Sequence, residues 1–598
     1  MLLTDASSAR VGAAAVGTMA LLSGVTQYLH TFATTALGRI FSGAINLIKN
    51  GPGILTLSGA NTYTGTTSVI GGVLSIPATS NLPGFSTSGK VAVASGATLA
   101  VGNSVTDAEI TTILGAAQFI ASSSLGFDTT AGNRTYGTAI TGNIGLTKIG
   151  ANTLTLSSAG SYTGQTRILE GTLATSAGNI LPDATTVNIS SGATLQLGGG
   201  DTIAAISGAG AVAMGANNLA LSGSNTTTHS GTITSTTGGL TKSGTGTLTL
   251  SGTGSSLGGA LQHQTGTLNL SGTLAIANNI QLAWSANNGT VNITGTLTQT
   301  GTSGPRGFQI AVNSNHVGTV NINGNVTLGS GFMLGDNGGG AGTLNVTGGT
   351  LTVTGQAWWA GINSTLNVSG GTVNASNSST FLGGGNGAGT TSTITISGTG
   401  YYNAGTFWFG IAQIATAQMI VNLNGGTLSV GALGSNTNGG TGVFHFNGGV
   451  FNVRSSASIP TNVSGNIKAG GAVISTNTNA TLTLTSALTD GGGGGGITKD
   501  GAGTLAMGNF AHAYTGSTTI NVGTITVSKT VSGSTATATF TLTTIAVSFA
   551  TAPAAGTQNF KFFPGATTQS YSPAFITLTG APGRSATYDS TTSTLIVT

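Results

Sequence analysis

The chain is short of charge, cysteine and proline. Its 598 residues include 15 Lys and Arg and 11 Asp and Glu, so charged side chains make up 4% of the sequence, where about 25% is usual. The few cations are scattered singly, which argues against a nucleic-acid-binding face. The absence of cysteine excludes disulfides, thiolate zinc sites and thiol nucleophiles. With 10 prolines beside 102 glycines, the chain is neither collagen-like nor a proline-rich linker.

Hydrophobic content separates a folded chain from a disordered one. Disordered chains combine low hydrophobicity with high net charge, but here 38% of residues are hydrophobic and the formal net charge is +4. We therefore expect the chain to fold, with Thr, Ser and Asn supplying most of its surface.

A long repeat occurs four times, starting at Ile45, Ile144, Gly239 and Gly496. Each copy carries one lysine at the same aligned position: Lys49, Lys148, Lys242 and Lys499. The first two copies are also followed by matching sequence, including SGATL at Ser95 and at Ser191. A unit much longer than the repeat itself has therefore been duplicated at the start of the chain.

A shorter repeat occupies the region between the third and fourth copies. Motifs such as VNITG at Val291 recur at an uneven interval of roughly 25 residues, a spacing that suits one turn of a β-solenoid. Apolar and polar residues alternate, so Val291 and Ile293 should point inward and Asn292 outward, and a glycine ends each motif at a corner. The motifs start at Val291, Val320, Leu344, Leu366, Ile394, Val421 and Phe444.

These repeats predict an all-β fold, a parallel β-helix (β-solenoid) over residues 43–527 with about 19 to 20 turns. Stacked parallel strands satisfy their backbone polar groups without many charged side chains. The outward Asn and Thr residues should form polar ladders along the stack. Loops of variable length should absorb the scatter in the repeat interval.

The two ends of the chain differ from the repeats. Apolar residues of residues 1–42, including Leu22, Val25, Leu29 and Phe32, follow helical spacing and predict a short N-terminal helical segment. This segment is interpreted as a cap, a coupler or a processed export signal, because its apolar run is too short to span a membrane. Residues 528–598 contain short β-like runs and predict a C-terminal β cap or a small β-domain.

The lysine-bearing copies follow the pattern G-L-T-K-x-G-x-G-T-L-T-L-S-G-x-x-x-Y-T-G-x-T, with G-T-L after it. This pattern resembles the autotransporter-associated β-strand repeat, also called the passenger-associated transport repeat. Residues 144–173 and 496–525 fit well, residues 45–74 differ beside the lysine, and the copy from Gly239 lacks the Tyr-Thr-Gly corner. The resemblance implies bacterial secretion or surface display of a right-handed parallel β-helix, in which the repeat aids export and folding. The segment after Val527 is too short for the membrane barrel of a complete autotransporter.

Candidate catalytic and metal-binding groups are sparse. Asp107 and Glu109 lie on a stretch that predicts a short helix, and Asp490 and Asp500 flank a run of six glycines. Neither pair recurs at the turn period, and a polysaccharide-degrading site needs two or more converging carboxylates. The six histidines show no metal-ligand spacing. We therefore expect no enzyme activity, no metal and no cofactor.

Aromatic side chains of the central turns are the candidate contact residues: Trp358, Trp359, Tyr401, Tyr402, Phe407 and Trp408. Exposed aromatics could bind sugar rings or a neighbouring molecule, whereas the alternative is that one of each adjacent pair fills the solenoid interior. Threonine rows such as Thr247-Leu248-Thr249 are similar to those of ice-binding solenoids. The T-x-T motif recurs irregularly along the sequence, which counts against that reading.

The sequence predicts a non-enzymatic protein with no transmembrane segment, and the family resemblance implies a bacterial protein that is extracellular or at the cell surface. Its first predicted role is a subunit of a surface fibre or filament, because a nearly uncharged rod with distinct ends can self-associate end to end. The alternative is an adhesin or secreted autotransporter-like passenger that binds glycans or surfaces.

Overall fold

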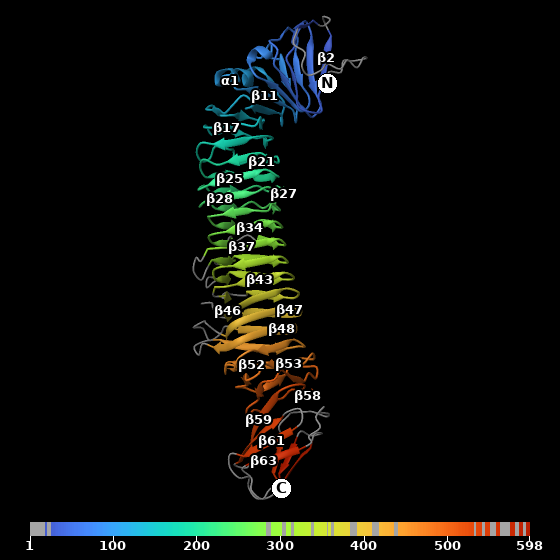
Figure 1. The fold of residues 1–598 in the computed structure, drawn as a ribbon, viewed down its shortest axis with the longest axis vertical. Helices are drawn as coiled ribbons and strands as arrows, with labels where there is room; N and C mark the ends of the chain where they lie inside the picture. The colour runs from blue at the N-terminus through green and yellow to red at the C-terminus, as the bar shows by residue number, and fades with distance from the viewer. Residues whose placement is uncertain are drawn as a thin grey trace. The chain divides into compact units, whose positions relative to one another are not determined.

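A computed structural model describes most of the chain (Figure 1). The described residues are 18–20, 25–282, 289–301, 307–312, 316–335, 340–355, 357–359, 364–382, 391–409, 418–435, 440–531, 534–540, 544–549, 558–561, 575–579, 585–589 and 594–597. Parallel strands of the described residues stack into a β-solenoid of about 20 turns. This confirms the predicted fold class.

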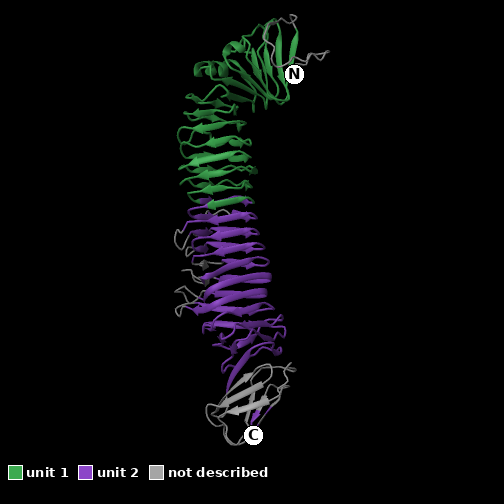
Figure 2. Cartoon of the chain, in the orientation of Figure 1, with its two compact units in different colours: residues 1–260, 271–275 green, residues 261–270, 276–598 purple. Residues whose placement is uncertain are grey.

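The chain divides into two compact units, one of residues 1–260 and 271–275, the other of residues 261–270 and 276–598 (Figure 2). In both units most strands alternate buried and partly exposed residues, which is the period-two pattern of a half-buried strand, and a few, such as Gly145–Ile149, are buried throughout. Val291 and Ile293, for example, are fully buried, while Asn292 between them faces outward. The inward and outward positions predicted from the short repeat are thus confirmed.

The first unit contains a short and a long column of paired parallel strands. The short column comprises β2 (Thr26–His30), β5 (Asn46–Asn50), β8 (Thr67–Val69), β10 (Val91–Val93) and β12 (Gln118–Phe119). The long column comprises β3 (Thr35–Leu37), β6 (Ile54–Leu57), β9 (Val73–Ile76), β11 (Thr98–Gly102), β13 (Ser124–Asp128), β16 (Gly145–Ile149), β19 (Thr166–Ile168), β21 (Thr186–Ile189), β24 (Ala205–Gly208), β27 (Thr227–His229) and β30 (Thr247–Leu250). Beside the later part of the long column run β14 (Arg134–Tyr136), β17 (Thr153–Leu156), β20 (Thr172–Thr175), β22 (Thr194–Gln196), β25 (Ala211–Gly215) and β28 (Ile233–Ser235).

Equivalent strands of the first and second repeat copies lie in different columns, and a helix is inserted in the chain between them. Helix α1 (Asp107–Ala116) lies between β11 and β12 in the chain, and β12 is the last described strand of the short column. The lysine-bearing strand of the first copy, β5, belongs to the short column, but that of the second copy, β16, pairs with β13 of the long column. The second copy is therefore shifted by one column relative to the first.

The second unit carries a column whose outward positions are rich in asparagine, here called the asparagine column. It comprises β33 (Gly266–Leu270), β36 (Gly289–Ile293), β39 (Val317–Ile322), β42 (Ala341–Val346), β45 (Thr365–Val368), β47 (Thr391–Phe409), β48 (Gln418–Ser435), β49 (Thr441–Phe446), β52 (Val463–Ile467) and β55 (Leu488–Asp490). The adjoining column contains β37 (Thr296–Gln299), β40 (Asn325–Leu328), β43 (Thr350–Val353), β46 (Thr372–Leu382), the later parts of β47 and β48, β50 (Val450–Val453), β53 (Ala472–Thr476), β56 (Ile497–Asp500) and β58 (Thr518–Ile520).

The described part of residues 1–42 forms strands, which corrects the predicted N-terminal helical segment. β2 and β3 are followed by β4 (Ile40–Gly43), and β1 (Thr18–Ala20) pairs with β4. Leu29 is buried whereas Tyr28 and Phe32 are 40% and 72% exposed, so the burial period is two rather than 3.6. Three short strands and the turns between them had given apolar residues a helix-like spacing. The first described coil thus begins before residue 43, and the proposed roles of residues 1–42 stay predictions.

The C-terminal strands depart from solenoid pairing. β59 (Thr524–Val531) pairs in parallel with β57 (Thr504–Ala506) and then in antiparallel with β60 (Ser534–Phe540). β60 continues into antiparallel pairing with β61 (Thr544–Phe549), which pairs with β63 (Phe575–Thr579). A second small sheet contains β62 (Gln558–Lys561), β65 (Thr594–Val597) and β64 (Ala586–Asp589). An antiparallel hairpin at the last coil covers strand edges that would otherwise stay unpaired.

Candidate functional site

The lysine of each repeat copy lies inside the solenoid. Lys49, Lys148 and Lys499 are fully buried and Lys242 is 4% exposed. They project from β5, β16, β56 and β29 (Leu240–Lys242), the strands that open the four copies. Within a copy this strand pairs with the strand of the following coil, as β16 does with β19. One copy therefore spans two consecutive coils.

Each ammonium group binds backbone carbonyls, and in the second copy these come from both coils. Lys148 Nζ donates to the carbonyl oxygens of Ile149 at 3.0 Å and Gly150 at 2.7 Å, in the turn after its own strand. It also donates to the carbonyl of Glu170 at 3.1 Å, one coil further on. Three N–H donors thus meet three carbonyl acceptors, which ties the two coils together.

The same arrangement recurs in the first and fourth copies. Lys49 Nζ donates to the carbonyls of Asn50, Gly51 and Gly71 at 3.0, 2.8 and 2.8 Å. Lys499 Nζ donates to the carbonyls of Asp500, Gly501 and Val522.

A glycine forms the turn that faces Lys148. Gly150 has a φ of +82°, and a Cβ at this position would lie 2.4 Å from the Thr130 amide nitrogen. Only glycine can therefore adopt this conformation at this close approach.

Burial lowers the pKa of Lys49, Lys148, Lys242 and Lys499 to about 8. Desolvation disfavours the charged form of a buried amine. Asp128 and Glu170 oppose this effect near Lys148 by raising its pKa. At neutral pH the side chains are still ammonium groups, which is the form with three N–H donors.

These lowered pKa values predict how stability depends on pH. Lysine in an unfolded chain titrates near about 10.4, well above the value of about 8 for the four buried lysines. Between these two values the unfolded chain binds more protons, so the free energy of unfolding rises with pH. We expect the urea midpoint to increase from about pH 8 to about pH 9.5, below the range in which tyrosines ionise. A flat or falling midpoint would contradict the lowered pKa, and Lys148→Met should rise less steeply than the wild type.

A buried tyrosine and threonine form the corner of three copies. Tyr162 Oη lies 2.6 Å from Thr166 Oγ1, and the Tyr63–Thr67 and Tyr514–Thr518 pairs have distances of 2.5 and 2.6 Å. All three tyrosines are 1% exposed. Burial raises the pKa of Tyr63 to about 12. Each hydroxyl is therefore satisfied inside the solenoid and takes no part in surface chemistry.

The comparison with protein families matches these same segments. The model of the passenger-associated-transport-repeat matches residues 47–76, 146–174 and 497–527. The β-solenoid of this chain therefore carries the passenger-associated transport repeat at three sites. No curated protein and no solved structure matched it.

The third copy of the long repeat, which starts at Gly239, lies outside the family match but keeps the lysine site. Lys242 Nζ donates to the carbonyl of Gly244. Leu257 and Leu261, both buried, stand in sequence where the other copies have the corner tyrosine and threonine. Because two leucines need no hydrogen-bond partner, the corner can change while the lysine site persists.

The candidate aromatic residues divide between the interior and the surface. Tyr402 and Phe407 are fully buried, so the structure corrects their assignment as contact residues. Tyr401 and Trp408 are partly exposed on the outer side. A Cβ at Gly434 would lie 2.6 Å from Cε3 of Trp408, so the indole covers the backbone of the neighbouring coil. The side chains of Trp358 and Trp359 lie outside the described residues.

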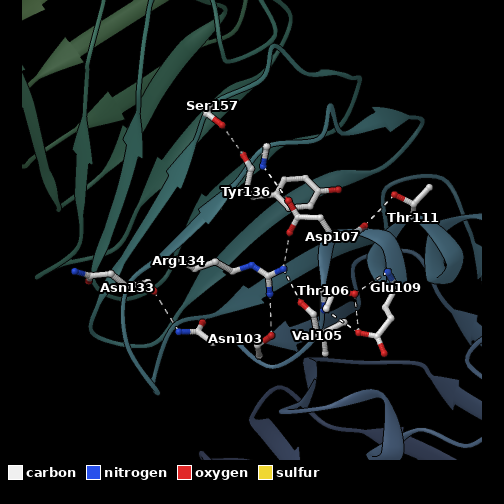
Figure 3. Close-up of polar contacts among 12 residues, drawn as sticks. Asn103, Val105, Thr106, Asp107, Glu109, Thr111, Asn133, Arg134, Tyr136 and Ser157 are labelled. Carbon is white, nitrogen blue, oxygen red and sulfur yellow. Dashed lines mark hydrogen bonds and ion pairs between the residues drawn. The ribbon is translucent and has the colours of Figure 1, made fainter.

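Asp107 and Glu109 lie in the first turn of helix α1 and make hydrogen bonds there (Figure 3). Asp107 Oδ1 accepts a hydrogen bond from Arg134 at 2.9 Å, and its Oδ2 accepts one from the Gly137 amide at 3.1 Å. Glu109 forms a capping box with Thr106, whose backbone N–H lies 2.8 Å from Glu109 Oε2 and lowers the pKa of that carboxyl. The short helix predicted at these residues is confirmed, and both carboxylates have structural partners.

Asp490 and Asp500 end strands of different columns, β55 and β56. Asp490 accepts hydrogen bonds from the Gly492 amide at 2.8 Å and from Thr515 Oγ1 at 3.1 Å. It therefore orders the start of the glycine run. Within the described residues no group of three or more metal-ligating side chains converges, and no helix has the length and apolarity to cross a membrane.

Proposed function

We propose that the chain is the passenger-type solenoid of a secreted or surface-displayed bacterial protein, with a structural and non-enzymatic role. The observation that supports this most is the buried lysine site, repeated in four copies, three of which match the passenger-associated transport repeat. The site joins successive coils by hydrogen bonds within one chain. Such joints stabilise a long stack without cysteine, and disulfides are therefore not needed for the fold to persist outside the cell.

The carboxylates favour a structural role over an enzymatic one. Asp107 and Glu109 are engaged with Arg134 and Thr106, and Asp490 with a turn of its own loop.

Assembly into a filament through the ends is the finer form of the proposal. It is supported by β2, the outermost described strand of its sheet, because Tyr28 on it and Phe32 after it are exposed. Tyr401 and Trp408 support the alternative of a glycan-binding adhesin.

The proposal is tested by locating the tagged full chain in its own bacterium. We expect it in the medium or on intact cells, where added protease removes the tag while a cytoplasmic marker survives. Retention in the cytoplasm would refute the proposal. Negative-stain electron microscopy of the exported chain then separates its finer forms, because filaments support end-to-end assembly and single particles at high concentration exclude it.

A further inference from the structure

The asparagine column carries a regular array of neutral hydrogen-bonding side chains on its outer side. Six consecutive strands place a threonine at one outward position and an asparagine or threonine two residues later. The first rank is Thr267, Thr290, Thr319, Thr343, Thr365 and Thr393, and the second is Asn269, Asn292, Asn321, Asn345, Asn367 and Thr395. We call these twelve residues the threonine–asparagine face.

The face is in register although its motifs are unevenly spaced in the sequence. Thr290 pairs with Thr319, and Thr319 with Thr343, although the first interval in the sequence is longer than the second. The connecting loops take up the difference. The uneven spacing of these motifs in the sequence is therefore absent from the folded surface.

The second rank is held in place by a ladder of amide hydrogen bonds. Asn292 Nδ2 donates to Asn269 Oδ1, Asn321 to Asn292 and Asn345 to Asn321, each at 2.8 Å, and Asn367 donates to Asn345 at 2.9 Å. Each of these bonds uses one N–H of an amide that has two. In Asn292, Asn321 and Asn345 the second N–H and the remaining oxygen lone pair are left for an external partner.

The threonine rank is available for contact. All six threonines are partly exposed, and among the described residues none of their hydroxyls has a hydrogen-bond partner within the chain. Each threonine presents one hydroxyl and one methyl group. Neither rank contains a charged residue. An uncharged partner can therefore cover this face without removing water from a charged side chain.

The spacing of the ranks fits ordered water. Neighbouring parallel strands lie about 4.8 Å apart, so each rank repeats at that distance. Water molecules joined tetrahedrally by O–H···O bonds of about 2.75 Å have second neighbours about 4.5 Å apart. The mismatch is about 0.3 Å per strand, which accumulates to about 1.5 Å over six strands. When the two lattices are centred on the rank, the displacement at either end is about 0.8 Å.

We propose that the threonine–asparagine face binds ice. The hydroxyls and second amide N–H groups would take positions of an ordered water layer, and the methyl groups would exclude mobile water between them. A neutral polysaccharide or a second copy of the chain could also meet an uncharged hydrogen-bonding surface. A neutral polysaccharide has no repeat on this surface that matches the strand spacing. A second copy of the chain has the same strand spacing, so self-association is one of the outcomes that the test must distinguish.

The test measures thermal hysteresis and incorporation into a growing ice surface, using the full chain. The face variant is the double substitution Thr319→Lys and Thr343→Lys. Its matched control is Thr298→Lys with Thr327→Lys, which places the same charges on paired outward threonines of the adjoining column. Circular dichroism and urea unfolding establish that both variants fold like the wild type.

We expect the wild type and the control to show hysteresis and to enter ice, with at least a several-fold loss in the face variant. No hysteresis or ice incorporation by the wild type would overturn the proposal, as would equal activity of the two variants. The proposal would also be overturned if the wild type lacked ice activity but bound a neutral glycan or self-associated, and only the face variant lost that interaction. The face would then be assigned to that partner. If the double substitution prevents folding, the single substitution Thr343→Lys is compared with the single control Thr327→Lys in the same assays.

Discussion

Replacing Lys148 by methionine should lower the local free energy of unfolding around the second repeat by about 2–4 kcal/mol. Methionine keeps most of the apolar stem but removes the three N–H donors. The carbonyls of Ile149, Gly150 and Glu170 then lose a partner in a buried site. A buried acceptor left without its partner costs about 1–3 kcal/mol, and the second lone pair of each carbonyl recovers part of that cost.

The effect should be local, because each coil of a solenoid contacts chiefly its neighbours. Amide hydrogen exchange followed by mass spectrometry is therefore the suitable measurement, and exchange should accelerate over β16 to β20. Lys90→Met is the matched control, since Lys90 Nζ makes one exposed hydrogen bond, to the Thr64 carbonyl at 2.7 Å. Unchanged protection in Lys148→Met, or an equal loss in the control, would show that the buried ammonium does not join the coils.

The lysine site also explains where some of the few cations are placed. Four of the 15 Lys and Arg residues occupy the same buried position in the four repeat copies. A carbonyl of the next coil completes each of the three fully described sites, through Gly71, Glu170 or Val522. The site can therefore form only when the next coil is laid down at the correct register. This gives the repeat a physical means of setting register during folding.

The alternation of inward and outward side chains along each strand was the part of the structure that the sequence could predict. The L-T-K segment places Lys148 two residues after Leu146, so an alternating strand puts both on the same, buried face. This signal was present in the sequence, but a lysine at an inward position runs against the usual exposure of charged side chains. The carbonyl partners come from a turn and from the next coil. They could be assigned only once the pairing of β16 with β19 was known.

Features that depend on long-range pairing could not be read from local patterns. The strands β2 to β4 were mistaken for a helix because apolar residues of these three short strands and of the turns between them happened to fall three or four positions apart. The shift of the second copy by one column follows from the pairing of β13 with β16, which no local motif marks. Tyr401 and Tyr402 are neighbours on one strand, so their side chains point to opposite sides. Tyr402 is buried and Tyr401 is partly exposed.

The second large effect is expected from Arg134→Leu, at the place where the columns shift. The Arg134 side chain is 8% exposed and donates to the carbonyls of Gly102 at 2.8 Å and Val105 at 2.7 Å (Figure 3). It also reaches Asp107 Oδ1 at 2.9 Å and lies over the Phe127 ring at 5.4 Å. Leucine retains packing against that ring but removes the Arg134 donor from both carbonyls. The Gly102 carbonyl keeps the Val105 backbone N–H at 3.1 Å, whereas the Val105 carbonyl loses its Arg134 partner. The expected loss is about 2–4 kcal/mol, seen as faster hydrogen exchange in α1 and in the segment before it.

Asp107→Asn separates the contribution of the ion pair from that of the carbonyls. The Asp107 side chain is 38% exposed, so water screens its attraction to Arg134, and exposed pairs contribute about 0–1 kcal/mol. Asparagine leaves the two carbonyl bonds of Arg134 intact, and protection of α1 should therefore fall much less than in Arg134→Leu. If Asp107→Asn loosens the helix as strongly, the ion pair rather than the carbonyl bonds holds α1. If neither variant changes exchange, then strand pairing between β13 and β16 is sufficient to fix the column shift, and the helix merely fills the space beside it.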